Sequence, residues 1–222
     1  MNYKRKEIIG DCTLYLGDCM DVMQGLDRFD AVVTDPPYGI NIAANPVRQK
    51  HEKMDWDKTP ITQSHIEKML SISAEQIIWG GNYFNLKPSR CFLVWDKVQP
   101  ENFSLAMCEQ AWFSRDANAK IFKKSVLSYS KQHPTQKPVE LMQWCLSFFA
   151  DGNSILDPFM GSGTTGVACA KMGRTFTGIE LEEKYFDIAC KRIREAYEQP
   201  DMFVQQEKPQ PTETVNMFEE SK

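Results

Sequence analysis

Three glycines near residue 160 restrict the folds open to this chain. Gly161, Gly163 and Gly166 follow the spacing G-x-G-x-x-G, between a short apolar run at 154–157 and a helix expected over 164–172. Glycines at such positions let the backbone turn tightly and approach a ligand. The pattern therefore predicts a strand, a ligand-binding loop and a helix within a parallel α/β sheet.

Carboxylates on either side of this loop indicate which ligand it would bind. Glu180 follows the next apolar run, where a carboxylate can accept hydrogen bonds from ribose hydroxyls. Asp157 stands where the loop begins, and there its charge would repel the pyrophosphate of NAD but attract an ammonium group. S-adenosylmethionine carries a ribose and an α-ammonium group and lacks phosphate. The loop therefore favours S-adenosylmethionine, and the alternatives are NAD or an ordinary turn with Glu180 on the surface.

A second constellation, Asp35-Pro36-Pro37-Tyr38, ends the apolar run 29–35. The amino group of a nucleobase is a poor nucleophile because its lone pair is delocalised into the ring. Acceptors for its two N–H groups would leave more electron density on nitrogen, and the Asp35 carboxylate and the Pro36 carbonyl could supply them. Pro37 restricts Pro36 to an extended conformation, and the Tyr38 ring offers a face to a base that has left the duplex. The alternative is a turn that only ends a strand, with Tyr38 in the core.

Apolar runs and helical stretches alternate along the chain, which is typical of a mostly parallel sheet covered by helices. Strands are expected at 29–35, 76–79, 91–95, 154–157 and 175–179, and helices at 18–26, 62–73, 138–150, 164–172 and 182–197. The predicted fold class is α/β, with a Rossmann-like, doubly wound sheet that binds ligands at the carboxyl ends of its strands.

Composition argues against several other classes of protein. The 222 residues are 42% hydrophobic and 25% charged, which fits one compact domain with a sizeable core. The apolar runs are far shorter than the ~20 residues of a membrane helix, and an apolar signal region does not follow residues 1–6, so we expect a cytoplasmic protein. The seven cysteines form no Cys-x-x-Cys pair, so we expect reduced, mostly buried thiols and no metal site.

A basic strip interrupts the net charge of −4. Residues 120–137 hold five lysines and no acid. Phosphate contacts are expected from Lys120, Lys123, Lys124 and Lys131, with Phe122 and Tyr129 available for stacking on bases. The alternative is a solvated edge strand that its lysines protect from pairing.

The two constellations together resemble the DNA amino-methyltransferases, which methylate adenine at its 6-amino or cytosine at its 4-amino nitrogen. Further segments similar to blocks of that family lie at 17–19, 79–84, 133–138 and 178–180, so the resemblance covers roughly residues 13–190. Asp35-Pro-Pro-Tyr38 precedes the glycine loop, which resembles the β-type order of motifs. We therefore expect a member of this family, which is found in restriction–modification systems, and we expect it to be a small phage- or prophage-like member.

The resemblance assigns roles by position. The catalytic turn would be Asp35, Pro36, Pro37 and Tyr38, and the wall of the methionine pocket would be Phe159, Gly161, Gly163 and Thr164. Glu180 would bind the ribose, Asp18 would approach the adenine of the cofactor, and Thr135 and Lys137 would lie beside its methionine end. For Lys137 the alternative is one more solvated lysine.

The resemblance also implies a seven-stranded methyltransferase sheet and methyl transfer from S-adenosylmethionine to the 6-amino group of a flipped-out adenine in double-stranded DNA. Aspartate at the first motif position leans toward adenine within this family. Alternatives are cytosine 4-amino methylation and, more distantly, methylation of an RNA or protein amide, a catalytically inactive DNA-binding protein and an NAD-dependent dehydrogenase. A separate recognition region has no room between Lys97 and Ser130, so residues 40–63 and the basic strip are expected to read the DNA.

The expected organisation is a catalytic domain at 1–198 and a disordered acidic tail at 199–222. Gln199-Pro-Asp-Met-Phe203 resembles the short peptides with which bacterial proteins bind the replication sliding clamp, so the clamp is a candidate partner. The alternative is a tail that packs back on its own domain through Phe203. A homodimer is left open.

Overall fold

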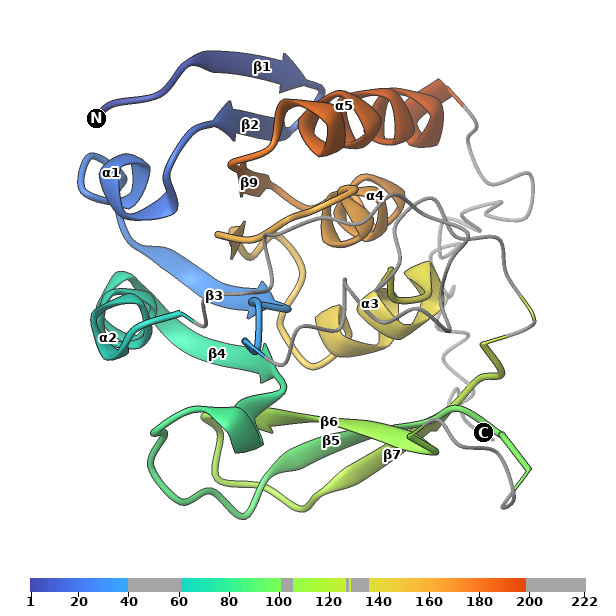
Figure 1. The fold of residues 1–222 in the computed structure, drawn as a ribbon. Coiled ribbons are helices and arrows are strands. Elements are labelled where there is room, and N and C mark those ends of the chain that lie inside the picture. The colour runs from blue at the N-terminus through green and yellow to red at the C-terminus, as the bar shows by residue number, and fades with distance from the viewer. Residues whose placement is uncertain (40–60, 101–105, 127, 129–135, 199–222) are drawn as a thin grey trace, which may run out of the picture.

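A computed structural model describes residues 1–39, 61–100, 106–126, 128 and 136–198 (Figure 1). Within these ranges one sheet has the strand order β1-β2-β9-β8-β3-β4-β6-β5-β7. The strands are β1 (Arg5–Ile9), β2 (Cys12–Leu16), β3 (Phe29–Thr34), β4 (Ser73–Trp79), β5 (Phe92–Asp96), β6 (Cys108–Phe113), β7 (Lys120–Lys123), β8 (Ile155–Asp157) and β9 (Phe176–Glu180). The helices are α1 (Cys19–Met23), α2 (Gln63–Ile72), α3 (Val139–Leu146), α4 (Thr164–Lys171) and α5 (Glu183–Glu198), with a 3₁₀ turn η3 (Gly81–Tyr83).

The predicted α/β class and mostly parallel sheet are confirmed, but the expected number of seven strands is wrong. The described sheet has nine strands. At one edge β1 pairs antiparallel with β2 through a turn at Gly10, and at the other β6, β5 and β7 extend the sheet beyond β4. The charged, alternating sequence of β1 and the short, lysine-flanked β7 lack the continuous apolar runs that marked the central strands.

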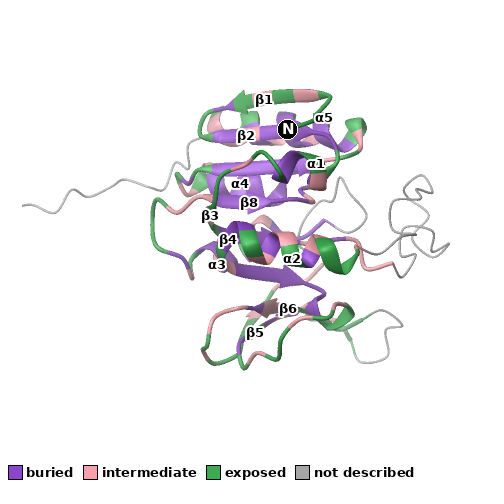
Figure 2. Ribbon diagram, turned by 90° about the vertical axis from the view of Figure 1, so that its left-hand side faces the viewer, coloured by how far each residue is buried: buried purple, intermediate pink, exposed green. Residues whose placement is uncertain are grey.

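Helices α1 and α2 cover one face of the sheet, and α3, α4 and α5 cover the other (Figure 1). A hydrophobic core lies on each face. In β3, Ala31 and Val33 belong to the core shared with α3, α4 and α5, whereas Val32 between them belongs to the core shared with α1 and α2. This alternation follows the period of two residues of a strand. Figure 2 shows that the central strands are buried, while the edge strand β1 carries exposed residues. Six of the seven cysteines are buried, and Cys108 is exposed.

Five neighbouring strands, β2, β9, β8, β3 and β4, run parallel. Their carboxyl ends therefore share one edge of the sheet. Asp18 follows β2, Glu180 ends β9, Asp157 ends β8 and Asp35 follows β3, so the strand order brings four carboxylates to that edge. β3 and β8 are neighbours in the sheet, but the chain continues from β3 to β4 on one side and from β8 to β9 on the other. Doubly wound sheets bind ligands at such a switch point.

Packing against α5 accounts for two of the three glycines, since a Cβ on Gly166 would lie 2.5 Å from Ile193 of α5 and Gly163 is similarly close to that helix. Gly163 precedes α4 with a φ of 77°, and a Cβ built on it would lie 2.8 Å from the Cβ of Ala189 in α5. We expected Gly163 in the wall of the methionine pocket, but the space of its missing side chain is filled by α5. By contrast, a Cβ on Gly161 would meet no heavy atom within 4 Å.

Among the residues that the structure describes, a helix long and apolar enough to cross a membrane is not found.

A matched pair of alanine variants tests the packing role of Gly163. Both Gly161 and Gly163 have a positive φ, so each exchange to alanine strains the backbone, but only Gly163→Ala also presses a methyl group into α5. We expect Gly163→Ala to lower the free energy of unfolding by about 3 kcal/mol and Gly161→Ala by about 1 kcal/mol, measured by urea denaturation. Equal losses in the two variants would contradict this assignment.

Candidate active site

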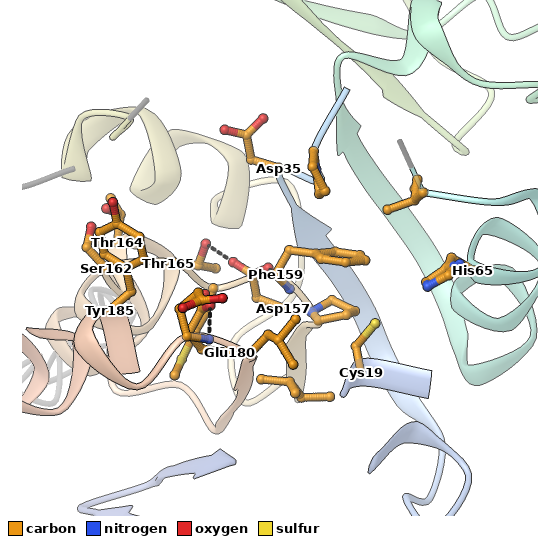
Figure 3. Close-up of a pocket in the computed structure, with 18 of the residues that line it drawn as sticks. Cys19, Asp35, His65, Asp157, Phe159, Ser162, Thr164, Thr165, Glu180 and Tyr185 are labelled. Atoms are coloured by element: carbon orange, nitrogen blue, oxygen red, sulfur yellow. Dashed lines mark hydrogen bonds between the residues drawn. The ribbon is translucent and has the colours of Figure 1, made fainter. Parts of the chain in front are cut away.

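A cavity of about 450 Å³ opens at the carboxyl edge of the central strands (Figure 3). A volume in this range suits a ligand of cofactor size. Around it Figure 3 shows Asp35 and Glu180 on opposite sides of Asp157 and Phe159. The lining includes Asp18, Asp35, Pro37, His65, Gln136, Lys137, Asp157, Phe159, Gly161, Thr164 and Glu180. The cavity therefore brings together residues of both predicted constellations, whereas Gly163 is not among its lining residues.

Asp157 is buried and anchors the start of the glycine loop. Its Oδ1 accepts hydrogen bonds from the Thr34 hydroxyl at 2.7 Å and the Phe159 N–H at 3.1 Å, and its Oδ2 accepts one from the Thr165 hydroxyl at 2.7 Å. Burial raises the pKa of Asp157 to about 6, although these donors oppose the shift. At neutral pH the carboxylate is mostly ionised, and its oxygens already accept hydrogen bonds from the loop and from Thr34 of β3.

Glu180 ends β9, the strand beside β8, and also lines the cavity. Its Oε1 accepts a hydrogen bond from the Glu182 N–H at 2.8 Å. Burial raises the pKa of Glu180 to about 7, against the effect of the backbone donors of Glu182, Leu181 and Gly161. The side chain is thus a partly buried acceptor held by the following turn, which is the geometry expected for binding hydroxyl groups.

The glycine loop is held from behind by Arg192 of α5. Arg192 Nη1 donates to the Ser162 carbonyl at 2.5 Å, to the Ser162 hydroxyl at 2.9 Å and to the Thr164 hydroxyl at 3.2 Å. Sequence analysis did not single out Arg192, because its place on the buried side of α5 depends on how that helix packs. The guanidinium fixes the loop between Gly161 and Thr164, both of which line the cavity.

The turn after β3 places Asp35 and Tyr38 together. The Tyr38 hydroxyl donates a hydrogen bond to Asp35, and the Tyr38 ring stacks on Tyr83 with 5.0 Å between centroids and 19° between planes. Gly80, with a φ of 67°, leaves the space that the Tyr38 ring fills, because a Cβ there would come within 2.2 Å of it. One face of Tyr38 is therefore covered by Tyr83 in this structure. Pro36 is buried and Pro37 lines the cavity.

Lys137 is not a solvated lysine, since its side chain is 4% exposed. Its ammonium forms an ion pair with Asp35 and a second one with Glu109 at 3.2 Å. Burial opposes the positive charge, but Asp35 and Glu109 together raise the pKa of Lys137. Lys137, which the resemblance assigns to the methionine end of the cofactor, thus lines the cavity. It also contacts Asp35, the predicted catalytic carboxylate.

Asp18 caps α1 at the edge of the cavity, where its Oδ1 accepts from the backbone N–H groups of Met20 at 2.8 Å and Asp21 at 3.2 Å. Opposite it, α2 contributes His65, a lining residue that sequence analysis missed because a histidine in the first turn of a helix is no motif. The His65 ring lies 6.3 Å from the Phe159 ring between centroids.

The basic strip is the edge strand β7 and the residues after it. Lys124 Nζ lies 3.0 Å from Glu140, and Lys123 Nζ lies 3.9 Å from Asp96, whereas Lys120 is exposed. Phe122 packs inward on Trp144, with 5.4 Å between ring centroids, so the expected availability of Phe122 for base stacking is wrong. Thr135, Lys131 and Tyr129 lie outside the described residues.

Comparisons with known proteins agree with this geometry. A family model described as DNA methylase matches residues 94–191. The chain is 34% identical over 139 residues to the Type II methyltransferase M2.DpnII of Streptococcus pneumoniae, a match that covers 62% of the chain and 48% of that protein. It is 36% identical over 119 residues to the Type II methyltransferase M.HinfI of Haemophilus influenzae, covering 53% of the chain and 30% of that protein. The chain thus spans about half the length of the first of these relatives.

Among solved structures, the M1.HpyAVI–SAM complex aligns with a TM-score of 0.57 at 26% identity, covering 82% of this chain and 99% of that one. The PvuII DNA methyltransferase, described as cytosine-N4-specific, aligns with a TM-score of 0.60 at 13% identity over 89% of this chain and 95% of that one, a likeness of fold alone. These matches confirm the resemblance to DNA amino-methyltransferases that the motifs predicted.

The raised pKa of Glu180 makes stability depend on pH in a defined direction. Between the ordinary value of 4.5 and about 7, the folded protein holds a proton on Glu180 that the unfolded chain has lost. The contribution of Glu180 to the free energy of unfolding therefore falls as pH rises through this window. Glu180→Gln should remove that contribution, so the stability difference between variant and wild type should shift in favour of the variant from pH 4.5 to 7. Chemical denaturation of both proteins at several pH values measures this difference in the free energy of unfolding.

The exposed Glu67→Gln variant on α2 controls for the loss of one carboxylate. A Glu180→Gln protein whose stability follows the wild type at every pH would contradict the burial argument.

Proposed function

We propose that this relative of the DNA amino-methyltransferases transfers a methyl group from S-adenosylmethionine to the 6-amino group of an adenine flipped out of double-stranded DNA. The observation that carries the proposal is that Asp35, after β3, and Glu180, at the end of β9, line one cavity, and that the glycine loop follows β8, the strand between them. A nucleophile activated at Asp35 and a cofactor held at Glu180 would then meet in one site.

The residues present fit the cofactor. Gly161 leaves open space where backbone and ligand would meet, Glu180 offers an acceptor for the ribose hydroxyls, and Asp157 supplies negative charge for the α-ammonium group. Asp18 would approach the adenine end, and Phe159 and Thr164 would line the methionine end, with Thr135 and Lys137 assigned there by resemblance. When bound, S-adenosylmethionine supplies an activated methyl group on a positively charged sulfur.

Asp35 and the Pro36 carbonyl would accept the two N–H groups of the target amine. Both acceptors increase the electron density on the amino nitrogen and stabilise the positive charge that develops there as the new N–C bond forms. Tyr38 would support this by its hydrogen bond to Asp35 and by stacking on the base once Tyr83 gives way.

Adenine is proposed over cytosine because Asp35 stands at the first position of the catalytic motif, where aspartate leans toward adenine in this family. Cytosine 4-amino methylation is the second candidate, since the same acceptors would orient either amine. Methylating duplex DNA with the purified protein, digesting it to nucleosides and identifying the modified base decides between them. N4-methylcytosine would replace the adenine assignment, and DNA without any methylated base would overturn the proposed function.

Replacing Asp35 should separate chemistry from cofactor binding. Asp35→Ala removes an acceptor for the target amine, so we expect methyl transfer to fall by about 10²–10³-fold or more while the affinity for S-adenosylmethionine changes little. Transfer of a labelled methyl group to DNA and calorimetry measure the two effects. The exposed Asp116→Ala variant is the control. Lost cofactor affinity in a folded Asp35→Ala protein would contradict the assigned role.

DNA contact through the edge strand β7 is proposed for its lysines. Lys120 and Lys123 are exposed, whereas Lys124 is occupied by Glu140, so the test uses the first two. The double variant Lys120→Gln and Lys123→Gln should flatten the salt dependence of DNA binding by a slope of about one per lost phosphate contact. Lys68→Gln on α2 serves as the control. An unchanged slope would show that β7 is a solvated edge strand.

Several predictions concern residues that the structure does not describe or properties it does not test. The acidic tail 199–222, with its sliding-clamp peptide at Gln199–Phe203, lies outside the described residues, as does most of the segment 40–63 expected to read DNA. The catalytic domain at 1–198, a homodimer and a cytoplasmic location stay predictions.

A further inference from the structure

A chain of four charged side chains, two partly buried carboxylates and two almost fully buried lysines, extends from Asp35 away from the cavity. Lys137 Nζ contacts Asp35 and lies 3.2 Å from Glu109 Oε2, and Glu109 Oε1 lies 2.6 Å from Lys97 Nζ. Two carboxylates and two ammonium groups thus alternate in sign. Lys97 and Lys137 are almost fully buried, and each ammonium also faces a tryptophan ring, Trp95 and Trp79 respectively.

The four residues come from separate parts of the fold. Asp35 follows β3, Lys97 follows β5, Glu109 lies in β6, and Lys137 precedes α3. Lys97 and Glu109 are absent from the cavity lining, and among the described residues the ion pair between Glu109 and Lys137 links them to the site. A buried ion pair is a weak source of stability, because desolvation offsets the attraction between the charges. Four such groups in one chain therefore call for a role beyond holding the fold.

Both carboxylate oxygens of Asp35 are engaged, one by the Tyr38 hydroxyl and the other by the Lys137 ammonium. Each carboxylate oxygen has two acceptor positions, and the ammonium occupies one of them, so Lys137 competes with a target amino group for Asp35. For the proposed reaction, an acceptor on Asp35 must become available to the base. Lys137 can release Asp35 without losing its only counter-charge because Glu109 already contacts the same ammonium.

We propose that Glu109 is a positioning residue for methyl transfer, which shares the Lys137 ammonium with Asp35 and holds it when the target base takes its place on Asp35. The inference rests on the proposed function and deepens it. Lys97 pairs with the other carboxylate oxygen of Glu109, so it lies outside the contact between Glu109 and Lys137. Without the charge of Glu109, Lys137 would keep Asp35 as its sole carboxylate partner and compete with the base.

The experiment compares three single variants of the full chain. Glu109→Gln should slow single-turnover methyl transfer at saturating DNA by about tenfold or more, with affinity for S-adenosylmethionine within about threefold of wild type. Glu109→Asp keeps a carboxylate and should restore most of the rate. Lys97→Met removes the outer partner of Glu109 but leaves Lys137 and Asp35 in place, so its rate should stay within about threefold of wild type.

A double variant isolates the competition by Lys137. In a Lys137→Met background the ammonium is gone, so adding Glu109→Gln should slow transfer by less than about twofold, whatever the rate of Lys137→Met alone. The proposal is overturned if Glu109→Gln transfers at the wild-type rate. It is also overturned if the loss persists in the Lys137→Met background, or if Glu109→Gln and Lys97→Met lose rate and thermal stability in parallel, as a purely structural role requires.

A titration of Asp35 by carboxyl ¹³C NMR tests the contact independently of activity. Asp35 faces Tyr38, Lys137 and Glu109, and the negative charge of Glu109 contributes to raising its pKa. Glu109→Gln should therefore lower the pKa of Asp35, and an unchanged pKa would overturn the proposal. A wild-type protein that transfers no methyl group overturns the proposed function and with it the role of Glu109. An active wild type with an unaffected Glu109→Gln variant overturns the role of Glu109 alone.

Discussion

Parallel pairing of β2, β9, β8, β3 and β4 is the constraint on which the site depends, because it brings four carboxylates to one edge of the sheet. Charges at a buried edge are unfavourable unless each one is compensated. Asp157 is compensated by hydroxyl and amide donors, and Asp35 by an ammonium. The two aspartates thus have different environments. The donors around Asp157 suit it to anchoring the glycine loop, whereas the ammonium beside Asp35 suits that carboxylate to exchanging its hydrogen-bond partners.

The glycine loop is held in place by side chains of α5. Arg192 and Ala189 of α5 shape the glycine loop from behind, one by hydrogen bonds and the other by close packing against Gly163. The loop geometry is therefore a property of the α4–α5 contact as much as of the glycines. This explains why glycines in one motif differ in role, with Gly161 facing the cavity and Gly163 facing a helix.

The sequence was most informative where a residue type and a strand end coincide. Asp35, Asp157 and Glu180 could be placed because apolar runs mark buried strands and parallel strands share an edge. Glu109 and Lys97 could not, because a carboxylate in β6 and a lysine after β5 look like ordinary surface residues until the antiparallel strands fold beside β4. Phe122 was misjudged for the related reason that Trp144, its packing partner, lies on a helix more than twenty positions away.

The pairing of β2 with β9 bears on how the chain is made. β2 ends at Leu16, but its parallel neighbour begins only at Phe176, so β2 has no such partner until the ribosome has synthesised β9. Contacts of such long sequence separation form slowly. Until then, the apolar side chains of β2, such as Leu14, stay open to other surfaces. The nascent protein should therefore need a chaperone or a pause in translation during this interval more than a protein whose strands all pair with neighbours in sequence.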